Sequence, residues 1–233
     1  MKESDLITGT YEMLEKGVIY DASKIYNDHF HPLFNEENYY QVLSRMVKNN
    51  RLMKVAKGLY YNPEYKDGKQ IPLTHKHIKK FMLPYHGLGF AVGESLYYRL
   101  KLTSKKPSNY TYYVNHIEVK TRTIQNSKFI RIYSEINDII IKHIECIDIL
   151  EHYESIHNIN LERFNQYISS FINNYNGNIM NDAIKVINPK KRTIAFLKEI
   201  LDEYNINNSL AIHLSATSKY HIPKWKQDFS KIC

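Results

Sequence analysis

Hydrophobic positions near the start of the chain recur every three or four residues, which is the spacing of one helix face. This spacing predicts a helix over residues 5–15 that ends before Gly17, a second helix in ASKIYND and a third in EENYYQVLSRMVKNN. Asp21 and Asn35 directly precede the second and third segments, where a side-chain oxygen can cap the first amides of a helix. The hydrophobic residues of the third segment share one stripe, which we expect to face a core: Tyr39, Leu43, Met46 and Val47.

Short apolar runs between these helices predict strands. GVIY is one, and RLMKV and GLYYNP are two more, joined through Ala56-Lys57-Gly58, where glycine tolerates the backbone of a hairpin turn. Helix, strand, helix, helix, hairpin is the order of a winged helix-turn-helix, whose third helix enters the major groove of DNA while its hairpin lies against the backbone. We therefore expect residues 1–65 to form a winged helix-turn-helix domain.

The remaining chain predicts a second domain of mixed character. Residues 64–72 are polar and contain Gly68 and Pro72, so we interpret them as a linker. Beyond it, HIKKFML and GESLYYRLKL predict helices, and NYTYYVNHIEV, KFIRIYSE and IIIKHIECIDIL predict strands. Helical spacing returns between residues 160 and 205, and we assign no structure to the last ten residues. The expected fold class is α+β, with a mixed α/β domain over residues 71–233.

Charge is unevenly distributed. The formal net charge of the 233 residues is +8, which favours an anionic partner such as nucleic acid. Residues 1–70 hold ten basic and ten acidic residues, yet between Asn38 and Pro63 every charged residue is basic. A surface that contacts phosphates would show this single sign. The charged residues of this stretch are Arg45, Lys48, Arg51, Lys54 and Lys57.

If the hydrophobic stripe is buried, the other face of the third helix carries side chains suited to a DNA groove. Asn38 and Gln41 can pair with adenine and Arg45 with guanine, while Tyr40 and Ser44 can reach phosphate. The predicted recognition residues are Asn38, Tyr40, Gln41, Ser44, Arg45 and Lys48, and the predicted wing contacts are Arg51, Lys54 and Lys57. The alternative is a solvated helix face and basic hairpin on a small domain that mediates protein contacts.

A second basic surface is also indicated. Residues 71–150 contain twelve Lys and Arg against six Asp and Glu. This excess predicts another nucleic-acid surface, a face for an acidic partner, or an ordinary solvated surface. Its candidate residues are Lys76, Lys79, Lys80, Lys105 and Lys106.

Other chemistry is weakly represented. The two cysteines, Cys146 and Cys233, exclude a disulfide framework, and the two H-x-H pairs (residues 29–31 and 75–77) lack further zinc ligands nearby. GLGFAVG does not have the spacing of a dinucleotide loop, and we interpret it as a turn before a helix. We therefore expect no metal, no cofactor and no catalytic residue.

The hydrophobic pattern of the sequence contains no targeting signal. The first residues, MKESDLITGTYEML, lack the apolar run of a secretory signal, and no stretch approaches the eighteen apolar residues of a membrane span. We expect a cytoplasmic protein with no membrane partner.

Three blocks of sequence resemble a known family. YQVLSRMVKNNRLMKVAKGLYYNP and FAVGESLYYRLKLTSKKPSNYTYYVN are similar to motifs of AbiEi-like antitoxins of type IV toxin–antitoxin systems and the related abortive-infection regulators. KKRTIAFLKEILDEYNI is similar to the late helix of the same family. Asn50 stands where the family usually has glycine, and Val42 stands where it has a small residue. The matching residues are Leu43, Ser44, Arg45, Val47, Lys48, Arg51, Leu52, Gly58, Leu59, Tyr60, Gly93, Ser95, Leu96, Leu102, Thr103 and Pro107.

The resemblance implies an antitoxin whose winged helix binds inverted repeats in double-stranded operator DNA and represses its own operon. It also implies a C-terminal domain that counters a nucleotidyltransferase-like toxin without a stable complex, and thus a role in phage defence. The alternative function is a protein-interaction module that sequesters a toxin or effector directly, with the winged helix as scaffold. An enzyme acting on nucleic acid is the less favoured third reading.

Overall fold

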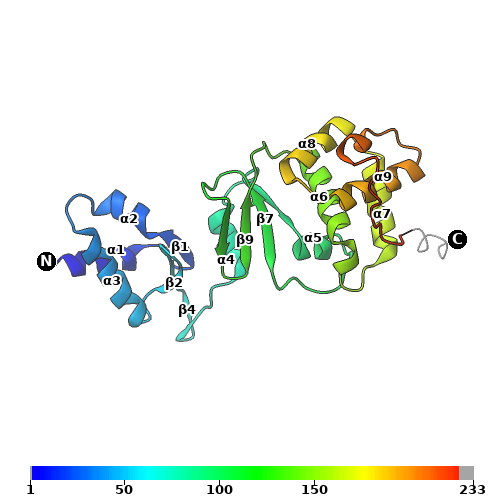
Figure 1. Cartoon of the computed structure of the whole chain (residues 1–233). Helices are drawn as coiled ribbons and strands as arrows, with labels where there is room; N and C mark the ends of the chain where they lie inside the picture. The colour runs from blue at the N-terminus through cyan, green and yellow to red at the C-terminus, as the bar shows by residue number, and fades with distance from the viewer. Residues whose placement is uncertain (1, 226–233) are drawn as a thin grey trace. The chain divides into compact units, whose positions relative to one another are not determined.

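The computed structural model describes residues 2–225 and mixes helices with small sheets, so the α+β class is confirmed (Figure 1). Contacts divide the chain into two compact units. Unit 1 comprises the residues up to Pro84 together with Thr123–Ser127, and unit 2 comprises Tyr85–Arg122 and the residues from Lys128 onward. Cys233 and most of the last ten residues lie outside the described residues.

The helices of unit 1 begin and end near the predicted positions. Asp21 accepts hydrogen bonds from the amides of Ser23 (3.0 Å) and Lys24 (3.3 Å), and Asn35 likewise caps the third helix, which confirms both predicted caps. The elements of unit 1 are α1 (Glu3–Met13), β1 (Val18–Asp21), α2 (Ala22–His29), α3 (Glu36–Lys48), β2 (Met53–Ala56), β3 (Leu59–Asn62), β4 (Tyr65–Lys66), β5 (Lys69–Gln70) and α4 (His75–Met82).

Strands β1, β3 and β2 form an antiparallel sheet with β3 in the centre. Tyr61 of β3 pairs with Ile19 on one side and with Met53 on the other. Asn62 at the end of β3 is buried, and its side-chain amide donates to the carbonyls of Tyr11 and Leu14 at 3.0 Å each. These bonds satisfy carbonyl groups at the end of α1, which otherwise lack partners within the helix.

Tyr39 occupies the centre of the unit 1 core and is completely buried. Its hydroxyl shares a hydrogen bond with the Tyr11 hydroxyl (2.6 Å) and donates to the Ala22 carbonyl (2.8 Å). Its ring packs against Tyr26 and Phe30, with centroids 5.2 and 5.5 Å apart. One side chain of α3 therefore contacts both α1 and α2. The predicted stripe is confirmed, since Leu43 and Met46 are buried and Val47 is half-buried.

Residues 64–72, interpreted from sequence as a linker, instead form the β4–β5 hairpin. Its turn residues Asp67 and Gly68 both have positive φ (51° and 72°), as the tight turn favoured by Asp-Gly requires. The Tyr65 hydroxyl donates to the Asn50 carbonyl at 2.9 Å. Helix α4, predicted to belong to the second domain, packs on β1 with Ile78 buried, so the division between the units falls after Pro84.

Unit 2 combines a sheet with a group of helices. The four-stranded sheet has the order β6-β7-β9-β8. The elements are β6 (Gly89–Val92), α5 (Glu94–Arg99), β7 (Tyr110–Val114), β8 (Thr121–Ile124), β9 (Ser127–Arg131), α6 (Asp138–His152), α7 (Leu161–Ile172), α8 (Gly177–Ile187) and α9 (Lys191–Glu203), with short 3-10 turns at Tyr153–Ser155 and Leu210–His213. The contact division assigns the end of β8 and the β8–β9 turn to unit 1.

Two sequence interpretations in unit 2 were wrong. Residues 139–150, predicted as a strand, lie in α6, because Asn137 caps the helix and α8, α9 and β6 cover it on several sides. An apolar run of this length fits a buried helix as well as a strand, so periodicity does not distinguish them. GLGFAVG, interpreted as a turn, contributes strand β6, which pairs antiparallel with β7.

The Tyr39 hydroxyl offers a direct test of the unit 1 core. We expect Tyr39→Phe to lower the free energy of unfolding by about 1–3 kcal/mol, because the buried Tyr11 hydroxyl would lose its partner. Urea denaturation of the full chain measures this. Tyr40→Phe is the matched control, since the Tyr40 ring is half-buried, and it should change the value by less than about 0.5 kcal/mol. Equal effects of the two variants would contradict the network.

Candidate nucleic-acid interface

The outer face of α3 presents most of the predicted recognition side chains together. Asn38, Gln41, Ser44, Arg45 and Lys48 are exposed. A single open hollow is lined by Glu37, Tyr40, Gln41, Ser44, Arg45 and Lys48. The structure thus brings five of the six predicted residues to one place and leaves Asn38 outside the hollow.

Tyr40 is half-buried, unlike the other members of this face. Its ring lies edge-on to the buried Tyr39, with centroids 5.2 Å apart. Desolvation, followed by the nearby Glu36 carboxylate, raises the pKa of Tyr40, so its hydroxyl stays protonated at neutral pH. It can therefore act as a hydrogen-bond donor but offers little ring surface.

Glu37 adds a carboxylate to this hollow that the charge pattern of the sequence did not predict. Glu36 and Glu37 occupy the first turn of α3, where negative side chains favour the helix dipole, and Arg45 and Lys48 occupy the last turn. The face is therefore negative at the start of α3 and positive at its end. The stretch in which every charged residue is basic starts at Asn38, directly after Glu37. The position of Glu37 in the hollow is therefore visible only in the structure.

The predicted wing is the β2–β3 hairpin. Lys54 and Lys57 are exposed on it, and Gly58 in its turn has φ of 74°. Arg51, just before β2, pairs with Glu12 of α1 at 2.9 Å, and both side chains are a little more than half exposed. One of the predicted wing cations is therefore already partly neutralised within unit 1.

Asn50 connects α3 to the hairpin in a left-handed conformation with φ of 56°, and its amide donates to the Val47 carbonyl at 3.1 Å. Asparagine is one of the few residues besides glycine that readily adopts this backbone. It therefore performs the local task that a glycine would perform at this turn. Val42, the other departure from the family pattern, is buried in the core.

The predicted second basic surface is divided between the two units. Lys76, Lys79 and Lys80 are exposed on α4 of unit 1, whereas Lys105 and Lys106 are exposed in the α5–β7 connection of unit 2. The β4–β5 hairpin adds two further exposed cations to unit 1, Lys66 and Lys69. The Asp-Gly pair between them was the sequence signal for this hairpin.

The structure shows where the two H-x-H pairs, at residues 29–31 and 75–77, lie. The Nδ1 atom of His77 lies 3.0 Å from both the amide and the hydroxyl of Thr74, as in a capping box at the start of α4. His29 and His31 are exposed at the end of α2. Within residues 2–225, no three His, Cys, Asp or Glu side chains gather as metal ligands would, and no helix there has the length and hydrophobicity to cross a bilayer.

Comparison with protein-family models and with curated proteins finds no match to this chain.

Proposed function

We propose that unit 1 is a winged helix-turn-helix that binds double-stranded DNA, with α3 in the major groove and the β2–β3 hairpin against the phosphate backbone. The observation that carries this proposal is the α3 face itself. Its inner side is fixed by Tyr39, and its outer side presents Gln41 and Arg45 to solvent. Glutamine and arginine are side chains that read adenine and guanine in the major groove.

The charges on this side of unit 1 support contact with phosphate. Arg45 and Lys48 on α3, and Lys54 and Lys57 on the hairpin, are exposed and form no ion pair with any described residue. Each such cation that neutralises a phosphate releases a counterion, so binding would weaken steeply as salt rises. The first turn of α3 would lie away from the two DNA strands, because the Glu37 carboxylate would repel their phosphates.

The sequence resemblance extends the proposal to biology. We infer that the chain acts in the cytoplasm as an antitoxin of a type IV toxin–antitoxin system, represses its own operon through inverted repeats, and counters a nucleotidyltransferase-like toxin through its C-terminal part. Only the sequence resemblance supports this extension, whereas the geometry of unit 1 also supports the DNA-binding proposal.

A second candidate function is direct sequestration of a toxin or effector by protein contact. Met13 at 89% and Leu33 at 80% are the most exposed of the large apolar side chains of unit 1, and a protein partner could bury them. Co-purification of a protein partner at high salt and without DNA would favour this candidate over DNA binding.

Substitution of Arg45 tests whether α3 recognises bases. We expect Arg45→Ala to weaken binding to DNA from upstream of its own reading frame by about 10–100-fold, and to reduce the preference over a scrambled duplex. Lys57→Ala should weaken both duplexes alike and reduce the salt dependence by about one phosphate contact. Electrophoretic shifts at several salt concentrations measure both effects.

Lys24→Ala is the control for these variants, because Lys24 is an exposed cation on α2 and belongs to neither α3 nor the hairpin. It should bind as the wild-type chain does. Wild-type affinity and preference in Arg45→Ala would rule out α3 as the recognition helix.

Breaking the Arg51–Glu12 pair should raise the affinity for duplex DNA, whereas the Arg45 and Lys57 substitutions should lower it. Glu12→Gln would free the Arg51 guanidinium and remove one negative charge, so duplex affinity should rise by roughly two- to fivefold at low salt. The gain should fade as the salt concentration rises. Glu15→Gln removes the same charge near the end of α1 without releasing Arg51, and a similar gain there would show that Arg51 takes no part.

A further inference from the structure

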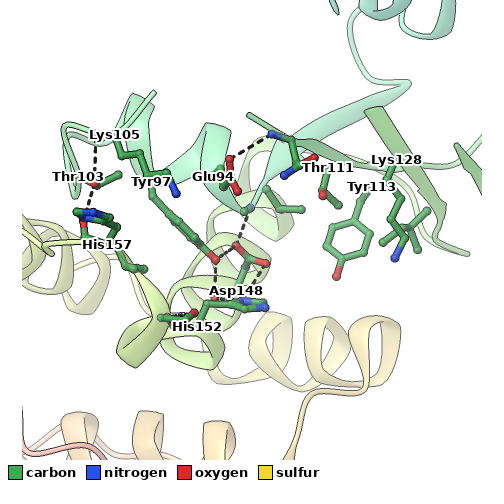
Figure 2. A pocket seen from close by; sticks show the side chains of 16 residues that line it. Glu94, Tyr97, Thr103, Lys105, Thr111, Tyr113, Lys128, Asp148, His152 and His157 are labelled. Carbon is green, nitrogen blue, oxygen red and sulfur yellow. Dashed lines mark hydrogen bonds and ion pairs between the residues drawn. The ribbon is translucent and has the colours of Figure 1, made fainter. Parts of the chain in front are cut away.

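Unit 2 contains a cavity of about 430 Å³ that the DNA-binding proposal does not use (Figure 2). Its walls come from β6, β7, β9, α5, the C-terminal end of α6, and the connections that follow α5 and α6. This volume is in the range of sites for small ligands. All of its lining residues belong to unit 2.

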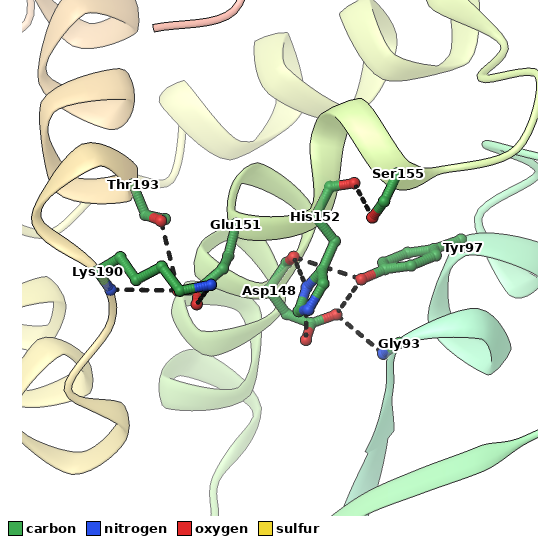
Figure 3. Close-up of polar contacts among 8 residues, drawn as sticks. All are labelled: Gly93, Tyr97, Asp148, Glu151, His152, Ser155, Lys190 and Thr193. Carbon is green, nitrogen blue, oxygen red and sulfur yellow. Dashed lines mark hydrogen bonds and ion pairs between the residues drawn. The ribbon is translucent and has the colours of Figure 1, made fainter. Parts of the chain in front are cut away.

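The cavity contains a carboxylate held in a fixed position. Asp148 Oδ2 accepts hydrogen bonds from the Gly93 amide (2.8 Å) and the Tyr97 hydroxyl (2.9 Å), as Figure 3 shows. Gly93 has φ of 65°, a conformation natural to glycine, which directs its amide at Asp148. Asp148 Oδ1 accepts no hydrogen bond from the described residues, and Nδ1 of His152 lies 3.6 Å from it. One carboxylate oxygen is thus available to a donor.

This carboxylate is unfavourable for folding in its ionised form. Burial is the largest cause that raises the pKa of Asp148, and it outweighs the hydrogen bond from Gly93. Because the pKa is higher in the folded than in the unfolded chain, ionised Asp148 lowers stability at pH values above its folded pKa. A residue kept at such a cost is typical of a binding or catalytic site.

Positive charge in the same cavity has no partner. Lys105 and Lys128 line it, are exposed, and form no ion pair within the part of the chain that the structure describes. The other lining carboxylate, Glu94, accepts hydrogen bonds from the Ser108 amide (2.7 Å) and hydroxyl (3.1 Å) and from the Asn109 amide (3.2 Å). Glu94, the first residue of α5, is therefore engaged in holding the α5–β7 connection, and the ammonium groups can attract an anion.

Aromatic side chains complete the cavity. Tyr97 and Tyr113 line it from α5 and β7. Burial raises the pKa of Tyr113 to about 12, so its hydroxyl remains a neutral donor at physiological pH. A planar ring of a ligand can pack against the half-buried Tyr113 ring, whereas Tyr97 is buried and contributes mainly its hydroxyl.

We propose that this cavity binds a nucleoside monophosphate, with its phosphate toward Lys105, its base against the Tyr113 ring, and a base N–H donated to Asp148; Lys128 lies at the other end of the cavity lining (Figure 2). The three features required are an anion, a planar ring and a hydrogen-bond donor. A mononucleotide is a small ligand class that combines all of them. This proposal does not depend on DNA binding by unit 1.

Isothermal titration of the full chain with AMP, CMP, GMP and UMP tests the proposal. We expect at least one of them to bind with a dissociation constant below about 1 mM. The matching nucleoside and inorganic phosphate should each bind at least about tenfold more weakly, because each lacks part of the contact. Failure of all four nucleotides to bind, or equal binding of phosphate alone, would overturn the assignment.

Variants separate the roles of the lining residues. Lys105→Gln should weaken nucleotide binding by about fivefold or more, whereas Lys106→Gln, which alters an exposed neighbour outside the cavity, should not. In Asp148→Asn the amide oxygen can still accept from Gly93 and Tyr97, so the melting temperature should not fall. The NH2 group takes the place of the free carboxylate oxygen, so nucleotide binding should weaken about tenfold. A lowered melting temperature with unchanged nucleotide affinity would show that Asp148 is structural. Equal losses of nucleotide affinity in Lys105→Gln and Lys106→Gln would contradict the phosphate site.

Discussion

The hydrogen bonds of the buried Tyr39 hydroxyl determine how α3 lies in unit 1. They connect α3 to α1 through Tyr11 and to α2 through Ala22. A polar group enclosed this deeply is stable only when its partners are correctly placed, because a lost partner leaves a desolvated hydroxyl. The network therefore favours one rotation of α3 about its axis. Since helix positions repeat every 3.6 residues, that rotation also sets which side chains face solvent.

Charge in unit 1 follows from this packing more than from the order of residues. The sequence suggested an uninterrupted basic stretch, yet α1 brings Glu12 to Arg51, and the first turn of α3 contributes Glu37 to the hollow lined by Arg45 and Lys48. The α3 face is consequently graded from negative to positive along its length. Such a gradient would orient a duplex on the surface, which a uniform basic patch would not do.

Helix α6 has two roles in unit 2. Most of its residues pack among α8, α9 and the sheet, while its C-terminal end places Asp148 and His152 at the cavity. Burial of Asp148 requires the Gly93 amide and the Tyr97 hydroxyl as compensation. The positive φ at Gly93 and the position of Tyr97 on α5 are therefore part of the same arrangement, and Figure 3 shows both residues beside Asp148. The apolar run that resembled a strand is what allows α6 to be enclosed.

The sequence by itself determined the local features of this protein. Asp21 and Asn35 identified two helix starts, and the stripe of Tyr39, Leu43 and Met46 identified a buried face, because caps and helical periodicity depend on neighbours within a few residues. Tertiary structure decided the rest. It made residues 139–150 a helix, joined α4 to unit 1, paired Arg51 with Glu12, and brought Asp148 to Gly93 across 55 positions. These outcomes depend on contacts between distant segments, which no local pattern encodes.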